Sequence, residues 1–346
     1  MAFKNVGTYD LGRAVSRSAG SANVATFTMD AAGITSGQAF LSSELEKRDP
    51  IIRTPLTSFT YARDIPIRVG GGWAEFVSTM QVGYGITGGS GDNLVHSGGS
   101  NGIPMVQADF SKGQYKAHMI AAGTRVMWID MQRGNMTGRN IDTLLRDGLR
   151  MAYDKHLDEN TYAGFARYGT TGLVNNEDVT VTNAESNGKT SPSTKFKDKT
   201  PDQILKDIND AILLAWSSCE YDNSAIPNHI LMPYEQFNYL ATTKVTELAE
   251  KTILTFLLEN NVAKQNGSDL VIVATKWCKG AGDAGADRMV VYRNEERFLA
   301  MDELAPLTRA MTSSNTQDFC FDTAYAGNLS EVEMFYDQSM IYVDGI

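Results

Sequence analysis

The sequence NIDTLLRDGLRMAYDKHLDENTYAGF, residues 140–165, predicts the longest helix of the chain. Its apolar residues recur at helical spacing and form one continuous stripe. The stripe consists of Ile141, Leu144, Leu145, Leu149, Ala152, Tyr153, His156 and Leu157. Asn140 is placed to cap the first turn, and no proline interrupts the run. At a rise of about 1.5 Å per residue the helix would be roughly 39 Å long, so we expect Leu145 and Leu149 to be buried against a sheet.

Composition and charge limit the classes of function. The chain has 346 residues, 42% of them hydrophobic, which predicts a soluble globular protein. Its apolar runs fall short of the roughly 20 residues of a membrane span, and its N-terminus lacks the apolar core of a signal peptide. The net charge of −10 disfavours binding of nucleic acid by charge neutralisation, and suits the wall of a container if DNA is nearby. The three cysteines, Cys219, Cys278 and Cys320, are odd in number and far apart, which predicts buried free thiols.

Upstream of the helix the sequence predicts an arm and a projecting hairpin. Residues 1–47 are poor in large apolar side chains and cannot form a core, so we expect an arm that becomes ordered on another surface; a floppy tail is the alternative. Residues 73–82 and 103–119 read as two strands, and the segment between them, 83–102, is about half glycine and serine. A further strand is predicted at 121–131.

Downstream of the helix a glycine turn at 169–176 and a polar, exposed excursion at 177–199 precede a second α/β region. Thr200, Pro201 and Gln203 form a strong helix start, with a capping threonine and a glutamine three residues later. Further helices are expected at 233–241 and 251–259. Strands are expected at 229–232, 269–274, 288–292, 318–326 and 331–336.

Two glycine patterns match enzyme motifs but lack the structural context that those motifs need. Gly83, Gly85 and Gly88 match the dinucleotide fingerprint, yet the chain continues into more glycine rather than into a helix that could hold a pyrophosphate. Gly98 and Gly102 flank Ser100 as in a nucleophile elbow, yet loop and strand surround it instead of a strand-to-helix turn. An α/β hydrolase that uses Ser100 is kept as the enzymatic alternative.

The remaining motifs give no site. The segment from Gly188 to Thr190 matches the end of a phosphate-binding loop, but Asn183 stands where the earlier glycine is required. The histidines show no metal spacing, and we interpret His156 as a packing residue of the long helix. These histidines are His96, His118, His156 and His229. The tryptophans are also read as packing residues: Trp73, Trp128, Trp216 and Trp277. We therefore predict no catalytic, cofactor-binding or metal-binding residue.

The order of these parts resembles the major capsid proteins of tailed phages, which have the HK97-like fold. An arm, a hairpin with a glycine-rich tip, a long helix, a turn containing Gly172-Leu173-Val174-Asn175 and an inserted α/β region carry the resemblance over most of the chain. It implies an α+β chain with an N-terminal arm, an extended hairpin loop, a peripheral domain with the long helix as its spine, an axial α/β domain and returning C-terminal strands. The implied boundaries are 1–60, 61–120, 121–199, 200–301 and 302–346.

The resemblance implies a structural protein rather than an enzyme. Such a subunit self-assembles into hexamers and pentamers, and these form the icosahedral head that encloses double-stranded DNA in the virion. A portal protein, and a scaffold or cement protein, are the other partners implied, with no membrane and no cofactor. An encapsulin-like nanocompartment shell is the alternative, and neighbouring genes for terminase and portal or for a cargo enzyme would separate the two.

Two departures from the prototype affect what we expect of the shell. The prototype cross-links its subunits through a lysine on the extended loop, but residues 83–102 contain none, and the nearest are Lys112 and Lys116. We therefore expect a shell held without covalent cross-links. The sequence also lacks a long charged helical prefix that could serve as a fused scaffold, which predicts a separate scaffold or a removed prefix.

Overall fold

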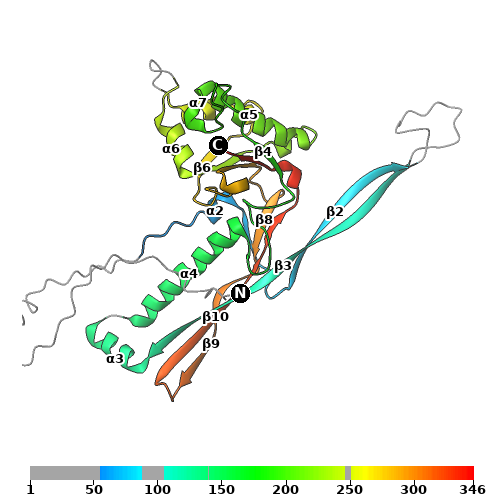
Figure 1. Ribbon diagram of the computed structural model, residues 1–346. Helices are drawn as coiled ribbons and strands as arrows, with labels where there is room; N and C mark the ends of the chain where they lie inside the picture. The colour runs from blue at the N-terminus through cyan, green and yellow to red at the C-terminus, as the bar shows by residue number, and fades with distance from the viewer. Residues whose placement is uncertain (1–54, 88–104, 139, 246–250) are drawn as a thin grey trace, which may run out of the picture. The chain divides into compact units, whose positions relative to one another are not determined.

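The computed structural model describes residues 55–87, 105–138, 140–245 and 251–346. The chain divides into a first unit, Met1–Ser58, and a second unit, Phe59–Ile346. All helices and strands formed by the described residues lie in the second unit (Figure 1). The predicted arm therefore falls almost entirely outside the described residues, as does most of the predicted hairpin tip.

The predicted long helix is confirmed as α4, Ile141–Ala163. The Asn140 side chain accepts a hydrogen bond from the Thr143 amide at 3.4 Å, as expected of the cap. After Gly164, which has a φ of 75°, the glycine turn folds back on the end of the helix. The Leu173 amide donates to the Thr161 carbonyl at 3.0 Å, so the turn satisfies a carbonyl that the helix leaves free.

The expected burial of Leu145 and Leu149 is wrong for the single subunit. Leu144 and Leu145 are exposed and Leu149 is only half-buried, whereas Leu157 and Tyr162 near the other end are fully buried. The reason is that the core into which α4 packs lies at its C-terminal half. There Leu157 and Tyr162 join a cluster with residues of the C-terminal strands, such as Leu329. The N-terminal half of α4 retains an uncovered apolar stripe.

The predicted hairpin is confirmed within a four-stranded sheet of order β2-β3-β10-β9. Its strands are β2 (Phe76–Thr87), β3 (Met105–Met127), β9 (Ala305–Asn315) and β10 (Cys320–Ser330). β2 and β3 pair antiparallel from Phe76 opposite Lys116 to Thr87 opposite Met105. β3 then continues beside β10, so the two strands predicted at 103–119 and 121–131 are one.

The prediction of strand to residue 131 is wrong, because helix α3, Trp128–Thr137, begins earlier. The physical reason lies in the partner strand. Cys320, the first residue of β10, pairs with Met127, and the Trp128 amide then donates to the Phe319 carbonyl at 2.8 Å. The ladder ends there, and α3 closes at Gly138 in the left-handed conformation.

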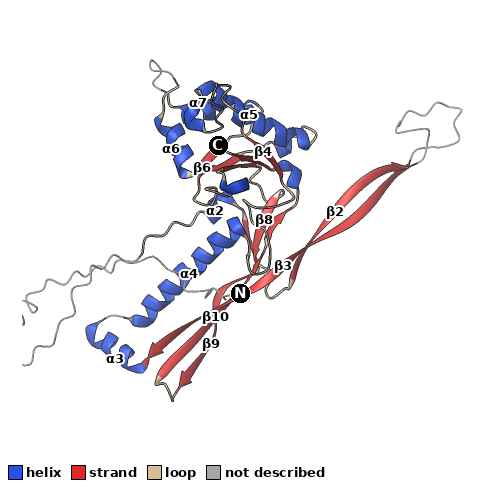
Figure 2. Cartoon of the chain, in the orientation of Figure 1, coloured by secondary structure: helices blue, strands red, loops and turns tan. Residues whose placement is uncertain are grey.

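The second α/β region folds as a five-stranded sheet of order β4-β12-β7-β5-β6, with helices beside it (Figure 2). Its strands are β4 (Thr180–Asn183), β5 (His229–Met232), β6 (Val271–Ala274), β7 (Arg288–Tyr292) and β12 (Ile341–Asp344). The helices are α5 (Pro201–Ser218), α6 (Tyr234–Thr242), α7 (Ile253–Glu259) and α8 (Val262–Gln265). The capping box at Thr200 is confirmed, and the apolar stripe of α5 is buried in the core. The polar segment 177–199 is not simply exposed, since it supplies β4 and the buried Phe196.

A small sheet, β1-β8-β11, lies at the root of the hairpin. It consists of β1 (Ile67–Val69), β8 (Leu299–Glu303) and β11 (Val332–Met334), and the short helix α2 (Tyr61–Asp64) precedes it. The described chain also has four short 3-10 turns, η1 (Phe196–Asp198), η2 (Asn223–Ala225), η3 (Asp283–Gly285) and η4 (Asp337–Ser339). Met301 of β8 and Leu157 of α4 share one core cluster, so this sheet connects the spine helix to the base of the hairpin.

Candidate functional site

The glycines of the apparent dinucleotide motif lie inside a strand. Gly83 pairs with Asp109 and Gly85 with Gln107 in the β2–β3 ladder, so neither stands in a strand-to-helix turn. Gly88, His96 and Ser100 lie outside the described residues. Gly188 has a φ of +66° in a loop, where the Lys189 ammonium donates to the Asp198 carbonyl at 3.0 Å, and no helix opens directly after it.

Two of the described histidines, His118 and His156, contact Phe165, whereas His229 lies beside Asp64. His118 pairs with Glu331 at 3.1 Å, and His229 pairs with Asp64 at 3.2 Å. His156 contacts the Phe165 ring edge-on, at 6.1 Å between ring centroids, which agrees with a packing role. Across the described ranges, no group of three or more His, Cys, Asp or Glu could hold a metal ion. The search of those residues likewise finds no helix that is long and apolar enough to cross a membrane.

The cysteines are free, as predicted, and two of the three are buried. Cys278 and Cys320 are buried and Cys219 is half-buried. Burial also raises the pKa of the Cys278 thiol, so the less reactive protonated form dominates at neutral pH. These thiols therefore give no sign of a reactive site.

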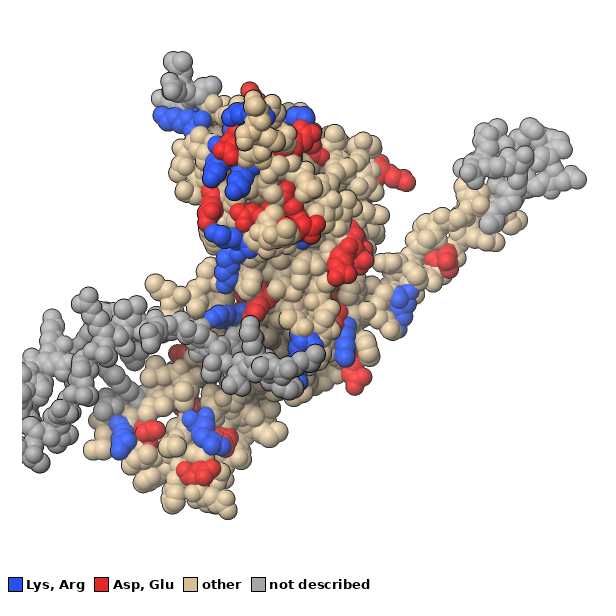
Figure 3. All heavy atoms as spheres, in the orientation of Figure 1, with Lys and Arg blue, Asp and Glu red and all other residues tan. Residues whose placement is uncertain are grey.

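The most distinctive surface of the described chain is one face of the hairpin. Cross-strand partners share a face, and the face that carries Phe76 and its alternate neighbours is apolar and exposed. Its exposed large apolar residues are Phe76, Met80, Val82, Tyr84, Ile86, Val106 and Phe110. Lys112 and Lys116 stand on the same face nearer the root. We call this surface the apolar hairpin face; in Figure 3 the described part of the hairpin is mostly uncharged.

The opposite face of the hairpin is small and polar. Between its end pairs it carries residues without large side chains: Thr79, Gln81, Gly83, Gly85, Gln107, Asp109, Ser111 and Gly113. At the root this face turns toward its own subunit, where the Tyr115 hydroxyl donates to the Met334 carbonyl at 2.6 Å. The Tyr115 ring also meets Phe335 edge-on at 6.2 Å. The opposite face therefore contacts its own subunit at the root, whereas the apolar hairpin face is exposed.

The apolar hairpin face lies on the same side of β3 that α4 covers further along the strand. Along β3 the even-numbered residues from His118 to Val126 are buried or half-buried, while the odd-numbered ones between Met119 and Met127 are exposed. α4 contacts this strand, and His118 packs on Phe165 just beyond the helix, at 4.6 Å between ring centroids. Because β3 pairs without a bulge, the covered face and the apolar hairpin face are one side of one strand.

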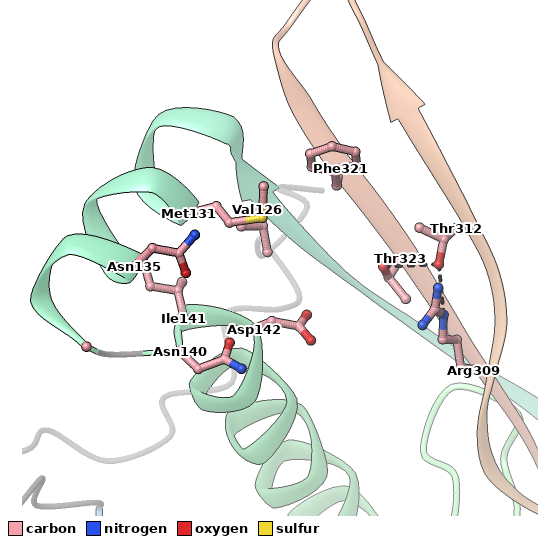
Figure 4. Close-up of a pocket in the computed structure, with 12 residues that line it drawn as sticks. Val126, Met131, Asn135, Asn140, Ile141, Asp142, Arg309, Thr312, Phe321 and Thr323 are labelled. Atoms are coloured by element: carbon pink, nitrogen blue, oxygen red, sulfur yellow. Dashed lines mark hydrogen bonds between the residues drawn. The ribbon is translucent and has the colours of Figure 1, made fainter.

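A second uncovered apolar surface lies at the other end of the four-stranded sheet. A cavity of about 610 Å³ opens between the start of α4 and the strands β9 and β10. Figure 4 shows Val126, Met131 and Ile141 facing Phe321 and the polar Arg309 across it. The helices that line it, α3 and α4, carry further exposed apolar residues: Trp128, Ile129, Met136, Leu144 and Leu145. Together with the apolar cavity lining, we call this the tip surface.

The tryptophans divide between core and surface. Trp277 is a packing residue as predicted, since it stacks on Tyr162 and donates to Asp158 at 2.8 Å, and Trp216 is also half-buried. Trp73 and Trp128 are exposed, so their interpretation as packing residues is wrong for the single subunit. Trp128 belongs to the tip surface, which a single subunit does not cover.

A buried polar cluster that the sequence analysis missed joins α2 to the spine helix. Asp64 is fully buried and receives hydrogen bonds from Arg63 and from the Tyr162 hydroxyl. Burial acts to raise the pKa of Asp64, but the hydrogen bonds from Arg63, His229 and Tyr162 outweigh it and hold the pKa below its usual value. This arrangement fixes the segment that leads from the first unit's end into β1, and only its Arg63-Asp64 pair is local enough to be seen in sequence.

Charge is distributed without a dominant basic region on the face drawn in Figure 3, where acidic and basic side chains are interspersed. With the net charge of −10, this pattern does not provide the clustered Lys and Arg that phosphate neutralisation requires. The apolar hairpin face and the tip surface are mainly apolar, which suits contact with protein.

Several solved phage and capsid structures have the same arrangement. The capsid of Myoviridae phage XM1 is similar with a TM-score of 0.72 and 16% identity, covering 88% of this chain and 98% of that one. A chain of Microbacterium phage Oxtober96 is similar with a TM-score of 0.57 and 13% identity, covering 88% and 98%. The capsid of a native GTA particle gives a TM-score of 0.57 and 10% identity over 92% and 99%. These similarities establish the fold, and they agree with the expected HK97-like fold.

The family follows from the sequence itself. The family model described as Major capsid protein matches residues 91–346, and the chain belongs to that family. No curated protein matches the chain. The protein is therefore a major capsid protein, a structural subunit whose place is the capsid shell, and the family expected from the order of elements is confirmed.

Proposed function

We propose that this protein builds the icosahedral head of a tailed bacteriophage from hexamers and pentamers of one subunit, and that the head encloses double-stranded DNA. The observation that carries the proposal is the apolar hairpin face, where large side chains such as Met80, Tyr84 and Phe110 are more than 60% exposed in the single chain. A contiguous exposed apolar surface marks an interaction site in a native protein. Its natural partner is a second copy, because the chain belongs to a family of shell subunits.

The uncovered stripe of α4 is the surface that we assign to receive the hairpin of a neighbour. Within one subunit, α4 already packs on the same side of β3 that becomes the apolar hairpin face. A second copy of α4, through Leu144 and Leu145, repeats that packing on the next part of the strand.

Contact of one surface with a different surface of the next copy is heterologous, and it closes into rings when the rotation permits. We assign residues 1–60 to the arm, 61–120 to the extended loop, 121–199 to the peripheral domain, 200–301 to the axial domain and 302–346 to the returning strands. A portal protein, and a scaffold or cement protein, complete the set of partners. DNA is enclosed without sequence-specific binding, and the subunit carries no catalytic residue.

Electron microscopy of the purified full-length protein tests this proposal. We expect closed shells or rings of subunits, and heads purified from infected cells should hold DNA that resists added nuclease. Shells that instead contain a co-purifying enzyme and no DNA would favour the encapsulin-like alternative. A monomer at all concentrations and ionic strengths would contradict both.

We further expect the mature shell to be held without covalent cross-links. The described hairpin offers Lys112 and Lys116 near its root, residues 83–102 contain no lysine, and Cys278 and Cys320 are buried. Shells boiled in denaturing detergent without reductant should therefore migrate as one band near 37.8 kDa. Multimer ladders that survive boiling would contradict this expectation, and replacing Lys112 and Lys116 by arginine would then identify the donor.

A further inference from the structure

Three charged side chains meet at the root of the hairpin, one from each strand of the small sheet. Arg68 on β1 donates from Nε to Asp302 Oδ1 at 2.5 Å and from Nη2 to Glu333 Oε2 at 2.6 Å. The Glu333 side chain is completely buried, and that of Asp302 is 12% exposed. One guanidinium therefore faces two buried carboxyl groups from β8 and β11.

The hydrogen bonds around Ser330 show which carboxyl group can carry a proton. The Ser330 hydroxyl lies 2.8 Å from the Glu331 carbonyl and 3.1 Å from Glu333 Oε1, and it accepts from the Asp302 amide at 2.9 Å. A hydroxyl has one proton to donate and two lone pairs. If Ser330 donates to the nearer Glu331 carbonyl, Glu333 must supply the proton of its own contact with Ser330. A protonated Glu333 satisfies every one of these groups.

Charge balance favours the same state. With Glu333 protonated, Arg68 and Asp302 form a neutral pair; with Glu333 ionised, the buried cluster carries one uncompensated negative charge. Burial is the main cause that raises the pKa of Glu333, to about 7, and the Asp302 carboxylate adds to it, while the Arg68 guanidinium acts in the opposite direction. From β3, the Tyr115 hydroxyl faces the same region, and burial, Asp337 and Glu333 raise its pKa to about 12.

The cluster stands where the hairpin joins the subunit. β1, which carries Arg68, is followed at once by Gly70, Gly71 and Gly72, all with positive φ, and β2 begins at Phe76. The Arg68 guanidinium also lies over the Phe335 ring, 5.6 Å from its centroid, and that ring meets Tyr115 of the hairpin. A change in the ion pairs of Arg68, or in the position of β11, therefore acts directly on the base of the hairpin.

We propose that Glu333 is a proton-dependent latch for the root of the hairpin. Protonated, it completes a neutral, fully hydrogen-bonded cluster that clamps β1 and β11 to β8. Ionised, it places a second carboxylate beside Asp302, and the strands loosen around it. The latch sets how firmly the hairpin is held on its own subunit, which is a property beyond the shell-forming role itself.

The direction of the pH effect follows from linkage. The pKa of Glu333 in the folded chain, about 7, lies above its ordinary value of 4.5. Stability from the protonated group is therefore fully present below pH 4.5 and is lost as the pH rises through 7. Between these limits this one proton makes the folding equilibrium constant fall by up to about tenfold per pH unit.

Hydrogen exchange of the full-length unassembled chain, followed by mass spectrometry from pH 5 to pH 9, tests the latch. After correction for the intrinsic pH dependence of exchange, we expect protection of peptides covering 67–76 and 330–336 to fall from pH 5 to about pH 7 and to level off above it. Glu333→Gln mimics the protonated acid, so its protection should stay level over this range. Asp109→Asn, an exposed carboxyl on the hairpin, should behave like the parent and serves as the control.

Asp302→Asn provides a second variant should Glu333→Gln fail to fold. Because the Asp302 carboxylate acts to raise the pKa of Glu333, its removal should lower that pKa, so the fall in protection should be smaller than in the parent and should end at lower pH. Equal pH dependence in the parent and Glu333→Gln, or an unmoved transition in Asp302→Asn, would overturn the latch. Because these readouts use the unassembled chain, they are independent of whether the protein forms a phage head.

Discussion

Phe110→Lys should abolish shell assembly while leaving the subunit folded. Phe110 lies in the middle of the apolar hairpin face, opposite Val82, and is 65% exposed in the single chain. Lysine there costs the subunit little, because the site is open to water. In the shell the same side chain would place an unpaired ammonium in an apolar contact, which costs several kcal/mol even after relaxation. The loss of phenylalanine burial adds roughly 1.5–3 kcal/mol, and both costs recur at every subunit.

The matched control for this variant is Gln107→Lys. Gln107 stands on the opposite, polar face of the same strand, pairs with Gly85 and is also exposed, so the change in charge is identical. We expect Gln107→Lys to assemble as the parent does. Sedimentation velocity separates shells from subunits, and circular dichroism checks the fold. Normal shells from Phe110→Lys, or equal failure of both variants, would show that the apolar hairpin face is not the contact.

Gly172→Ala should prevent the subunit from folding, whereas Gly148→Ala should stabilise it. A Cβ at Gly172 would lie 2.4 Å from backbone atoms of Tyr162, and neither chain segment can move because Leu173 and Val174 bond to the end of α4. We expect a loss of at least about 3 kcal/mol, enough to leave the protein insoluble. A Cβ at Gly148, inside α4, meets open space, and alanine there should add about 0.5–1 kcal/mol.

Urea unfolding of the unassembled chain measures Gly148→Ala, and the soluble yield measures Gly172→Ala. The midpoint of Gly148→Ala should rise without a change in slope, because the same surface is exposed on unfolding. Soluble Gly172→Ala with the midpoint of the parent would contradict the close approach of the turn to the helix. Both variants make the same glycine-to-alanine change, so opposite effects on stability would reflect the structure around each glycine and not a general effect of alanine.

The elements that could be predicted are those whose signals are local. α4 and α5 follow from a cap, an apolar stripe and an uninterrupted run, and the hairpin follows from two strands around a glycine-rich segment. The burial of Leu145 could not be predicted correctly from the single chain, because its apolar stripe indicates a partner without saying whether that partner is in the same copy. The start of α3 at Trp128 was missed because it depends on where β10, almost 200 residues later, begins.

The buried polar clusters around Glu333 and Asp64 were the features hardest to predict from the sequence. Arg68 and Glu333 are 265 residues apart, and alternation along 331–336 assigns Glu333 to the same side as Glu331, which reads as a solvent face. The fold buries that position beside Ser330 and Arg68 instead. A carboxyl group within a short apolar strand is the one signal that could have drawn attention to it. Asp64, tied to Tyr162 across 98 residues, was hidden for the same reason.

The most direct test of the account is a side-chain-resolution electron cryo-microscopy reconstruction of the assembled shell. We predict that Met80, Tyr84 and Phe110 of one subunit contact a second copy, on the half of α4 that carries Leu144 and Leu145. We also predict that the opposite hairpin face, at Tyr115, keeps its contact with Met334 of its own subunit. A shell in which the apolar hairpin face remains exposed to solvent, with subunits joined elsewhere, would contradict the central claim.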